Sequence, residues 1–217
     1  MSLAIFDLDN TLLRGDSDHA WGMFLVERGL VDGETYQLAN ERYYAQYRDG
    51  TLDIMEFLAF ALAPLARVEP ATLRAWHHEF MQAKIRPMIT APARALVEQH
   101  RARGDTLLII TATNRFVTAP IAREFGIENL LATDPETVDG RYTGRIDGVP
   151  CYREGKVIRL REWLALHRHT LDDSWFYSDS HNDLPLLETV THPVAVNPDE
   201  ILRATAQTRG WTVLRLE

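Results

Sequence analysis

The stretch Leu3-Ala4-Ile5-Phe6-Asp7-Leu8-Asp9-Asn10-Thr11 decides the fold and places the chemistry. Its apolar first part does not alternate with polar residues, which predicts a strand buried on both faces of a parallel sheet under helices. Asp7 and Asp9 follow that strand, and ligands of open α/β sheets bind beyond the carboxyl ends of the strands. Because an unpaired buried carboxylate is costly, the pair predicts a bound cation at this end of the sheet.

The composition is typical of a globular protein without a nucleic-acid partner. The 217 residues, 46% hydrophobic and 25% charged, suffice for one α/β domain with a smaller satellite. A net charge of −8, with no dense cluster of Lys and Arg, argues against a nucleic-acid-binding surface. The single cysteine, Cys151, permits no internal disulfide, so we expect a cytoplasmic protein.

Nothing in the sequence predicts export or a membrane partner. The first predicted strand begins at once, and no basic leader with a cleavage site precedes it. The most apolar later stretch, Met55 to Ala66, contains Glu56 and Pro64 and is shorter than the ~20 apolar residues that a bilayer span requires. We therefore expect no transmembrane segment.

Helices dominate the part of the chain that follows the first strand. Capping residues and apolar spacing predict four successive helices, at about 16–28, at 34–48, from Thr51 to just before Pro64, and at 70–84. From Ala91 onward, helices alternate with strands, which are expected at 106–111, 174–179, 193–196 and 212–216. Turn signals within 130–146 predict short strands or a hairpin there.

This order of elements predicts an α/β fold. Strands that alternate with helices favour right-handed βαβ units and a mostly parallel sheet. We predict a Rossmann-like, mostly parallel sheet core from residues 1–13 and 87–217, with a small helical cap inserted at residues 14–86. The cap begins close to Asp7 and Asp9, so it could close over whatever these carboxylates bind.

The paired aspartates suit the hydrolysis of a phosphate ester. This reaction requires a nucleophile, a proton donor for the leaving oxygen, and cations that offset charge on the phosphoryl oxygens. Asp7 could attack phosphorus to form an aspartyl-phosphate, and Asp9 could protonate the leaving alcohol and then deprotonate water. An isolated Asp-x-Asp pair is more often a solvated turn, but this pair ends a buried strand. A calcium loop is excluded because Leu12 and Asp18 occupy the positions of its glycine and glutamate.

Two more strand ends carry groups that suit phosphate and magnesium. Asp179 ends a predicted strand, and Asp183 lies near a helix start, where it could instead be a plain helix cap. Two acidic strand ends can converge on one metal ion. Thr111 ends another strand, and its hydroxyl and the following amides could cradle phosphate oxygens or cap a helix. Lys156 could supply a fixed positive charge, although a single lysine is usually a surface residue.

The order of these residues resembles the four motifs of the haloacid dehalogenase superfamily. The motifs are the apolar strand with Asp7-x-Asp9-x-Thr11, then Thr111, Lys156 and the Asp179/Asp183 pair, and they span the whole predicted core. The helical insertion after the first motif and the run from Asp179 to Pro185 resemble the phosphoserine-phosphatase-like branch, subfamily IB, of this superfamily.

The resemblance implies a role for each of these residues. Asp7 would be the nucleophile, and Asp9 would be the acid/base, with its backbone carbonyl on magnesium. The implied magnesium site consists of Asp7, Asp9, Asp179 and Asp183, the last of which would mainly hold ligand waters and Lys156. The implied phosphate-binding residues are Thr111, Lys156 and Asn182. An aspartate at position 9 implies a phosphatase rather than a dehalogenase, because carbon–halogen cleavage requires no leaving-group acid there.

Two departures from the family pattern concern the phosphate loop and the substrate. The chain has Thr111-Ala112-Thr113 where the family often has Ser-Gly-Gly, so the approach of the backbone to phosphate could differ. Asp16 stands where phosphoserine phosphatases carry a substrate-binding glutamate, and its shorter side chain could still meet an ammonium group. A substrate carboxylate would need a cap arginine, for which Arg42 and Arg48 are both candidates.

The leading hypothesis is a magnesium-dependent phosphomonoesterase acting on a small phosphorylated metabolite, such as the amine-bearing phosphoserine or histidinol phosphate. The alternatives are a non-hydrolytic phosphoacceptor or regulatory protein, a phosphotransferase, and a degenerate binding protein on the same fold. A P-loop nucleotide triphosphatase is excluded because G-x-x-x-x-G-K-[ST] is absent, and Val157 follows Gly155-Lys156.

Overall fold

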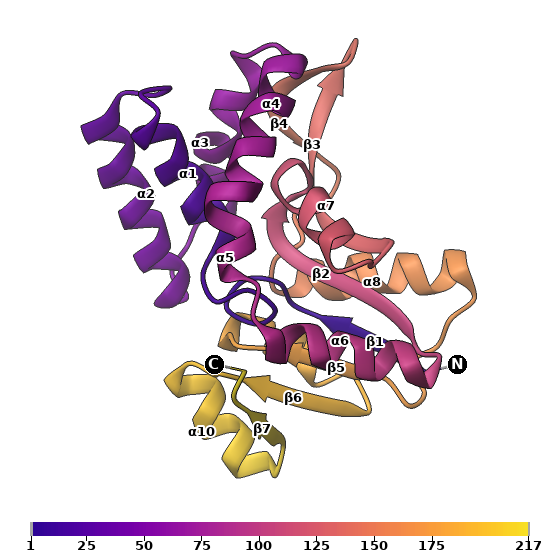
Figure 1. The fold of residues 1–217 in the computed structure, drawn as a ribbon. Coiled ribbons are helices and arrows are strands. Elements are labelled where there is room, and N and C mark those ends of the chain that lie inside the picture. The colour runs from indigo at the N-terminus through magenta and orange to yellow at the C-terminus, as the bar shows by residue number, and fades with distance from the viewer. Residues whose placement is uncertain (1, 217) are drawn as a thin grey trace.

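A seven-stranded sheet forms the centre of the computed structural model, which describes residues 2–216 (Figure 1). The strands are β1 (Leu3–Phe6), β2 (Thr106–Asn114), β3 (Asn129–Val138), β4 (Arg141–Asp147), β5 (Trp175–Ser178), β6 (His192–Val196) and β7 (Thr212–Leu214). Their order across the sheet is β4-β3-β2-β1-β5-β6-β7, and all neighbours are parallel except β3 and β4. The predicted α/β fold with a mostly parallel sheet is confirmed.

The central strand β1 has the two-sided burial that its sequence predicts. It pairs with β2 on one side and with β5 on the other, and each of its residues is 0% exposed. Ala4 and Phe6 belong to one hydrophobic core, whereas Leu3 and Ile5 belong to a second core on the other face. Asp7 therefore lies directly after the carboxyl end of the central strand, in the middle of the row of strand ends.

Helices fill the chain between β1 and β2 and cover the sheet elsewhere. The helical elements before β2 are α1 (Ser17–Glu27), α2 (Gly33–Arg48), α3 (Ile54–Ala66), α4 (Pro70–Phe80), the π-helical turn η1 (Met81–Ile85), α5 (Arg86–Met88) and α6 (Ala91–Arg103). Those after β2 are α7 (Arg115–Glu124), α8 (Glu154–His167), the 3-10 turn η2 (His181–Asp183), α9 (Leu184–Leu187) and α10 (Glu200–Arg209). Figure 1 shows α1 to α4 gathered beyond one end of the sheet, beside the β3–β4 hairpin. Within residues 2–216, no helix has the length and apolar character needed to span a bilayer.

One prediction of a helix end is wrong, and another predicted helix contains a wider turn. The third helix does not stop before Pro64, because α3 continues to Ala66 and buries Leu65 to 1% exposure in the core. Pro64 lies near the end of the helix, where the packing of Leu65 outweighs one lost backbone hydrogen bond. The helix predicted at 70–84 is present as α4 continued by η1, whose wider turn the sequence does not indicate and which buries Met81 and Ile85.

The hairpin that the turn signals at 130–146 predict is present as β3 and β4, and it lies against α3. Asp139 and Gly140 at its tip both have positive φ angles, 51° and 76°, which is the form of a two-residue hairpin turn. Gly144 has a φ of +83°, and a Cβ added there would lie 3.4 Å from the Cβ of Ala66. The hairpin thus approaches α3 closely at a glycine.

The two segments that connect α1–α5 with the sheet lie side by side. Leu13 and Ile89 form an antiparallel bridge, and the Arg14 amide donates to the Met88 carbonyl oxygen at 2.8 Å. These residues flank the predicted boundaries of the helical insertion. The division into a core and a cap at 14–86 stays a prediction, and the paired root is consistent with it.

Candidate active site

Asp7 lies at the centre of the candidate site, directly beyond β1. Its amide donates to the Tyr177 carbonyl oxygen of β5 at 2.9 Å, which extends the strand pairing by one residue and positions the side chain. Asp7 is 3% exposed. Burial raises the pKa of Asp7 to about 7, with the charge of Asp183 adding to this effect and that of Lys156 opposing it.

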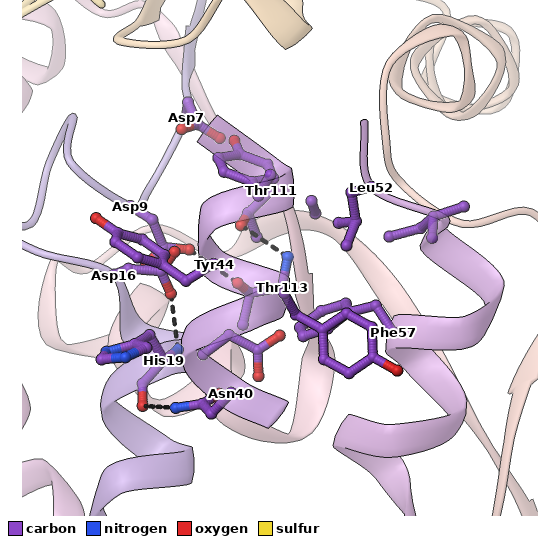
Figure 2. A pocket seen from close by; sticks show the side chains of 15 residues that line it. Asp7, Asp9, Asp16, His19, Asn40, Tyr44, Leu52, Phe57, Thr111 and Thr113 are labelled. Carbon is purple, nitrogen blue, oxygen red and sulfur yellow. Dashed lines mark hydrogen bonds between the residues drawn. The ribbon is translucent and has the colours of Figure 1, made fainter. Parts of the chain in front are cut away.

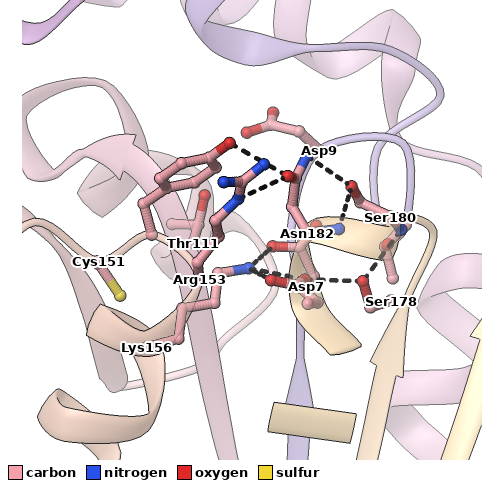
Figure 3. A network of polar contacts seen from close by, with 12 residues as sticks. Asp7, Asp9, Thr111, Cys151, Arg153, Lys156, Ser178, Ser180 and Asn182 are labelled. Atoms are coloured by element: carbon pink, nitrogen blue, oxygen red, sulfur yellow. Dashed lines mark hydrogen bonds and ion pairs between the residues drawn. The ribbon is translucent and has the colours of Figure 1, made fainter. Parts of the chain in front are cut away.

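Lys156 is the buried cation of the site (Figure 3). It is 1% exposed, and its Nζ lies 2.7 Å from Asp7 Oδ1 and 2.8 Å from Asp183 Oδ2. Burial alone would lower the pKa of Lys156, but the charges of Asp183 and Asp7 outweigh burial and raise it, so the lysine stays charged. Ser178 Oγ also donates to Asp183 Oδ2, at 2.7 Å. The structure therefore brings Lys156, Asp7 and Asp183 together.

Gly155 allows the start of α8 to carry Lys156 into the site. A Cβ added at Gly155 would lie 2.0 Å from the Pro150 carbonyl oxygen, so a larger residue requires the backbone to move. The same turn holds Arg153 at φ 49° and ψ −121°, a conformation that is costly for a residue with a side chain. The position of the buried cation thus depends on a tight turn.

We expect Gly155→Ala to lower the free energy of unfolding by about 2–4 kcal/mol, because Pro150 and the start of α8 must separate. Urea denaturation measures this change. Gly33→Ala is the matched control, since a Cβ at Gly33 would meet Val26 Cγ1 at 3.7 Å, an ordinary contact. Equal stability of the two variants would contradict the tight-turn account.

Asp9 lies beyond the strand and is held by two donors. The Ser17 amide donates to its Oδ1 at 2.6 Å, and Thr113 Oγ1 donates to its Oδ2 at 2.8 Å. Burial, followed by the charge of Asp16, raises the pKa of Asp9 to about 7, although the two hydrogen bonds lower it in part. A carboxyl group with this pKa can give and take a proton near neutral pH, as an acid/base catalyst must.

The strand that carries Thr111 is longer than expected and adds a residue that the sequence analysis misses. Strand β2 runs to Asn114, with a register shift between Ile110 and Asn114. Thr111 is 1% exposed, and its Oγ1 accepts from the Thr113 amide at 3.2 Å. Thr113 is the missed residue, because it bonds Asp9. Its signal in the sequence is the second hydroxyl of Thr-Ala-Thr, where the family often has glycine.

The remaining carboxylate, Asp179, leaves the site with surplus negative charge. Thr11 Oγ1 donates to Asp179 Oδ1 at 3.2 Å. Burial, and then the charges of Asp7 and Asp183, raise the pKa of Asp179 well above its ordinary value. Lys156 supplies one positive charge against these three carboxylates. Oxygen donors with this excess of negative charge fit a divalent cation such as Mg²⁺.

The magnesium site stays a prediction. Within residues 2–216, no group of three or more His, Cys, Asp or Glu side chains is arranged to hold a metal ion by itself. Mg²⁺ usually takes one or two carboxylates and completes its octahedron with water and substrate phosphate. Asp183 is bonded to Lys156 and Ser178, and its part in a magnesium site stays a prediction.

Asn182 connects α2 with the sheet. Its Oδ1 accepts from Tyr152 OH at 3.1 Å and from Arg153 Nε at 3.0 Å (Figure 3). Its Nδ2 donates to the Tyr47 carbonyl oxygen at 3.0 Å. Arg153 also donates to the Gly50 carbonyl oxygen, at the end of α2. The contact of Asn182 with phosphate stays a prediction. Arg153 is a second residue that the sequence analysis misses, because only the folded chain brings it to α2.

A pocket beside Asp7 is lined by residues of α1, α2 and β2, together with the start of α3 (Figure 2). The lining comprises Asp7, Asp9, Asp16, Asp18, His19, Asn40, Tyr43, Tyr44, Tyr47, Leu52, Ile54, Phe57, Thr111, Ala112 and Thr113. Four of these are acids, and no Lys or Arg from the described part of the chain is among them. Burial lowers the pKa of His19, which favours its neutral ring. The pocket is therefore suited to a cationic ligand.

Asp16 lies in this pocket at the N-terminus of α1. Its Oδ1 accepts from the His19 amide at 2.8 Å, so it also caps the helix. Burial raises the pKa of Asp16, and the charge of Asp7 adds to the effect. A positive group bound beside Asp16 would favour its charged form. Asp16 thus lies in the same pocket as Asp7, and its role in substrate binding stays a prediction.

Neither candidate arginine lines this pocket. Arg42 lies on the surface, where its Nη2 is 2.9 Å from Glu56 Oε1 and its guanidinium covers the Tyr43 ring. Arg48 lines a neighbouring pocket, which contains Asp179 but not Asp7. The expected cap arginine for a substrate carboxylate therefore has no counterpart among the residues that line the acidic pocket.

Comparison with known proteins identifies the family. A model of the haloacid dehalogenase-like hydrolases matches residues 4–188. The chain belongs to this family. It is 49% identical over 220 residues to a histidinol-phosphatase from Neisseria meningitidis serogroup C, an alignment that covers 100% of this chain and 99% of the relative. It is also 34% identical over 218 residues to a phosphoserine phosphatase from Mycobacterium tuberculosis, covering 97% of this chain and 69% of the relative.

Solved structures share the fold. A protein of unknown function from Bordetella pertussis Tohama I superposes with a TM-score of 0.94 at 50% identity, covering 100% of this chain and 99% of that one. A phospho-aspartyl intermediate analogue of phosphoserine phosphatase has a TM-score of 0.73 at 15% identity, covering 100% and 93%. At this low identity the second match shows the fold alone. The family and the relatives confirm the predicted class of enzyme, a phosphomonoesterase of the haloacid dehalogenase family.

Proposed function

We propose that this phosphatase is magnesium-dependent, forms an aspartyl-phosphate on Asp7, and acts on the phosphate ester of a small amino alcohol. Histidinol phosphate is the substrate that fits best. The observation that carries the proposal is the pocket beside Asp7, which is lined by four acids and by no Lys or Arg from residues 2–216. The 49% identity to a histidinol-phosphatase supports the same substrate.

The first half of the reaction belongs to Asp7 and Asp9. Lys156 holds Asp7 Oδ1, which leaves Oδ2 to attack phosphorus in line with the ester oxygen. As the Oδ2–P bond forms, the bond between phosphorus and the ester oxygen breaks. Asp9, protonated because its pKa is raised to about 7, gives its proton to that oxygen and releases the alcohol.

The second half regenerates the enzyme. Asp9, now a carboxylate, removes a proton from water, and the water oxygen attacks phosphorus. The Oδ2–P bond breaks, inorganic phosphate forms, and Asp7 returns to its carboxylate. The Thr111 hydroxyl and the Lys156 ammonium group would hold the phosphoryl oxygens through both steps, because Lys156 contacts Asp7 and Thr111 lines the same pocket as Asp7.

Four acidic residues would make up the magnesium site. The carboxylates of Asp7 and Asp179 and the backbone carbonyl of Asp9 would hold Mg²⁺, which when bound offsets negative charge on the phosphoryl oxygens. Asp183 would act by keeping Lys156 in place, and by holding water near the ion. Its contacts with Lys156 and Ser178 support this secondary role.

The pocket favours substrates that have an amine and no carboxylate. Asp16 would bind the ammonium group, since its carboxylate lies in the same pocket as Asp7. A phosphoserine carboxylate would lie among acids with no Lys or Arg beside them, and each ionised carboxylate at ~4 Å would repel it by several kcal/mol. Neither Arg42 nor Arg48 lies there to compensate. Histidinol phosphate carries the amine without the carboxylate.

A phosphate-release screen tests this function. With Mg²⁺, kcat/KM for histidinol phosphate should exceed that for phosphoserine by about a hundredfold or more, because the acids repel the extra carboxylate. Phosphoethanolamine, a sugar phosphate and a nucleotide complete the panel, and EDTA should abolish release. Reaction in ¹⁸O-labelled water distinguishes hydrolysis from transfer to another acceptor. Equal rates on phosphoserine and histidinol phosphate would reject the proposed pocket preference.

A further inference from the structure

Asp18 is a buried acid of the pocket to which the proposed reaction gives no role. It lies in the first turn of α1, two residues beyond Asp16, and lines the same pocket. It is 9% exposed, and its Oδ2 has no hydrogen-bond partner among residues 2–216. Asp9 and Asp16, in contrast, both accept hydrogen bonds from protein groups.

A buried carboxylate oxygen without a hydrogen-bond partner is costly. The charged groups and donors around Asp18 therefore indicate which kind of ligand would pair with it. Burial, and then the charges of Asp16 and Asp9, raise the pKa of Asp18 well above its ordinary value. No Lys or Arg lines the pocket in the described chain, and burial favours the neutral form of His19. The N-terminus of α1 favours a nearby negative charge, but it leaves Oδ2 without a donor. A protonated nitrogen of a bound ligand would supply the donor that Oδ2 lacks and would favour the charged form of Asp18.

The wall opposite the acids suits a flat ring. Figure 2 shows Leu52 and Phe57 across the pocket from Asp9 and Asp16. Tyr43, Tyr44 and Tyr47 add further aromatic surface from α2. Aromatic and aliphatic side chains beside carboxylates bind a ring that is apolar on its faces and cationic at its edge.

We propose that Asp18 is a second cation-binding group of the substrate pocket, which accepts a hydrogen bond from a protonated nitrogen other than the amine held by Asp16. This inference rests on the proposed function and narrows its substrate class. The class is phosphate monoesters that carry two protonatable nitrogens, one an ammonium group and the other in a flat ring such as imidazole. Asp18 thus selects the ring, whereas Asp7 and Asp9 act on the phosphate.

Binding of histidinol, which lacks the phosphate, tests Asp18 separately from catalysis. Isothermal titration calorimetry should show histidinol bound by the wild type and bound about tenfold or more weakly by Asp18→Asn, because a charged hydrogen bond is lost. Ethanolamine, which has the amine but no ring, should lose less than threefold in the same variant. Asp32→Asn is the matched control, since Asp32 begins α2 without a side-chain capping bond and lies outside this pocket.

Kinetics provides the second readout. The ratio of kcat/KM for histidinol phosphate to that for 4-nitrophenyl phosphate should fall about tenfold or more in Asp18→Asn, mainly through KM for histidinol phosphate. Absence of histidinol binding by the wild type would overturn the inference. Equal affinity of the wild type and Asp18→Asn for histidinol would also overturn the inference, even if the substitution lowers the unfolding temperature. A wild type that binds histidinol through Asp18 but releases no phosphate from histidinol phosphate would instead reject the proposed function alone.

Discussion

Replacing Asp7 with asparagine is expected to abolish phosphate release, with kcat lower by about 10⁴-fold or more. The amide of asparagine cannot form the acyl-phosphate that carries the phosphoryl group to water. No neighbouring acid can replace it, because Lys156 and Ser178 hold Asp183, and Ser17 and Thr113 hold Asp9. Release of phosphate from histidinol phosphate and from 4-nitrophenyl phosphate measures the loss.

The same substitution should leave the protein folded. Asparagine has the size of aspartate, and burial raises the pKa of Asp7 to about 7, so the ionised form is costly in the metal-free protein. The unfolding temperature of metal-free Asp7→Asn should therefore equal or exceed that of the wild type. Asp53→Asn is the control, because Asp53 caps α3 outside the pocket and asparagine also caps helices, so kcat should be unchanged. Residual activity near the wild-type level in Asp7→Asn would exclude Asp7 as the nucleophile.

The central part of the fold could be predicted because its signals are local. Four apolar residues of β1 have no polar face, so they require helices on both sides of the sheet. Polar residues that follow several such strands meet at one edge, since the carboxyl ends of parallel strands share it. This rule is enough to bring Asp7, Thr111 and Asp179 to one end of the sheet before any contact is known.

The residues that the sequence analysis misses depend on the path of the backbone. Thr113 reaches Asp9 because β2 continues past Thr111 with a register shift, which no apolar pattern indicates. Arg153 contacts α2 through a turn with a positive φ angle. Asp18 lies in the first turn of α1 close to Asp16, and only its burial and its Oδ2 without a partner among residues 2–216 distinguish it. These properties arise from packing between distant segments, so spacing along the chain does not show them.

Replacing Lys156 with methionine is expected to destabilise the metal-free protein by about 3–5 kcal/mol, because it leaves Asp7 and Asp183 buried without their cation. Methionine keeps much of the volume of the lysine stem, so the loss reports charge rather than a cavity. Urea denaturation at neutral pH measures it, and phosphate release should fall about a hundredfold or more because a phosphate-binding charge is removed.

The chain offers a matched control, because Lys84 is its only other lysine. Lys84 Nζ lies 2.7 Å from Glu27 Oε1, the same distance that separates Lys156 from Asp7, but this pair is 28% and 51% exposed. Water already solvates such a pair, so Lys84→Met should cost at most about 1 kcal/mol and keep full activity. The double variant Lys156→Met/Asp183→Asn should regain part of the stability, since one uncompensated carboxylate is removed, but it should regain little activity. Equal destabilisation by Lys84→Met and Lys156→Met would mean that the buried ion pairs of Lys156 with Asp7 and Asp183 do not stabilise the protein more than an exposed ion pair does.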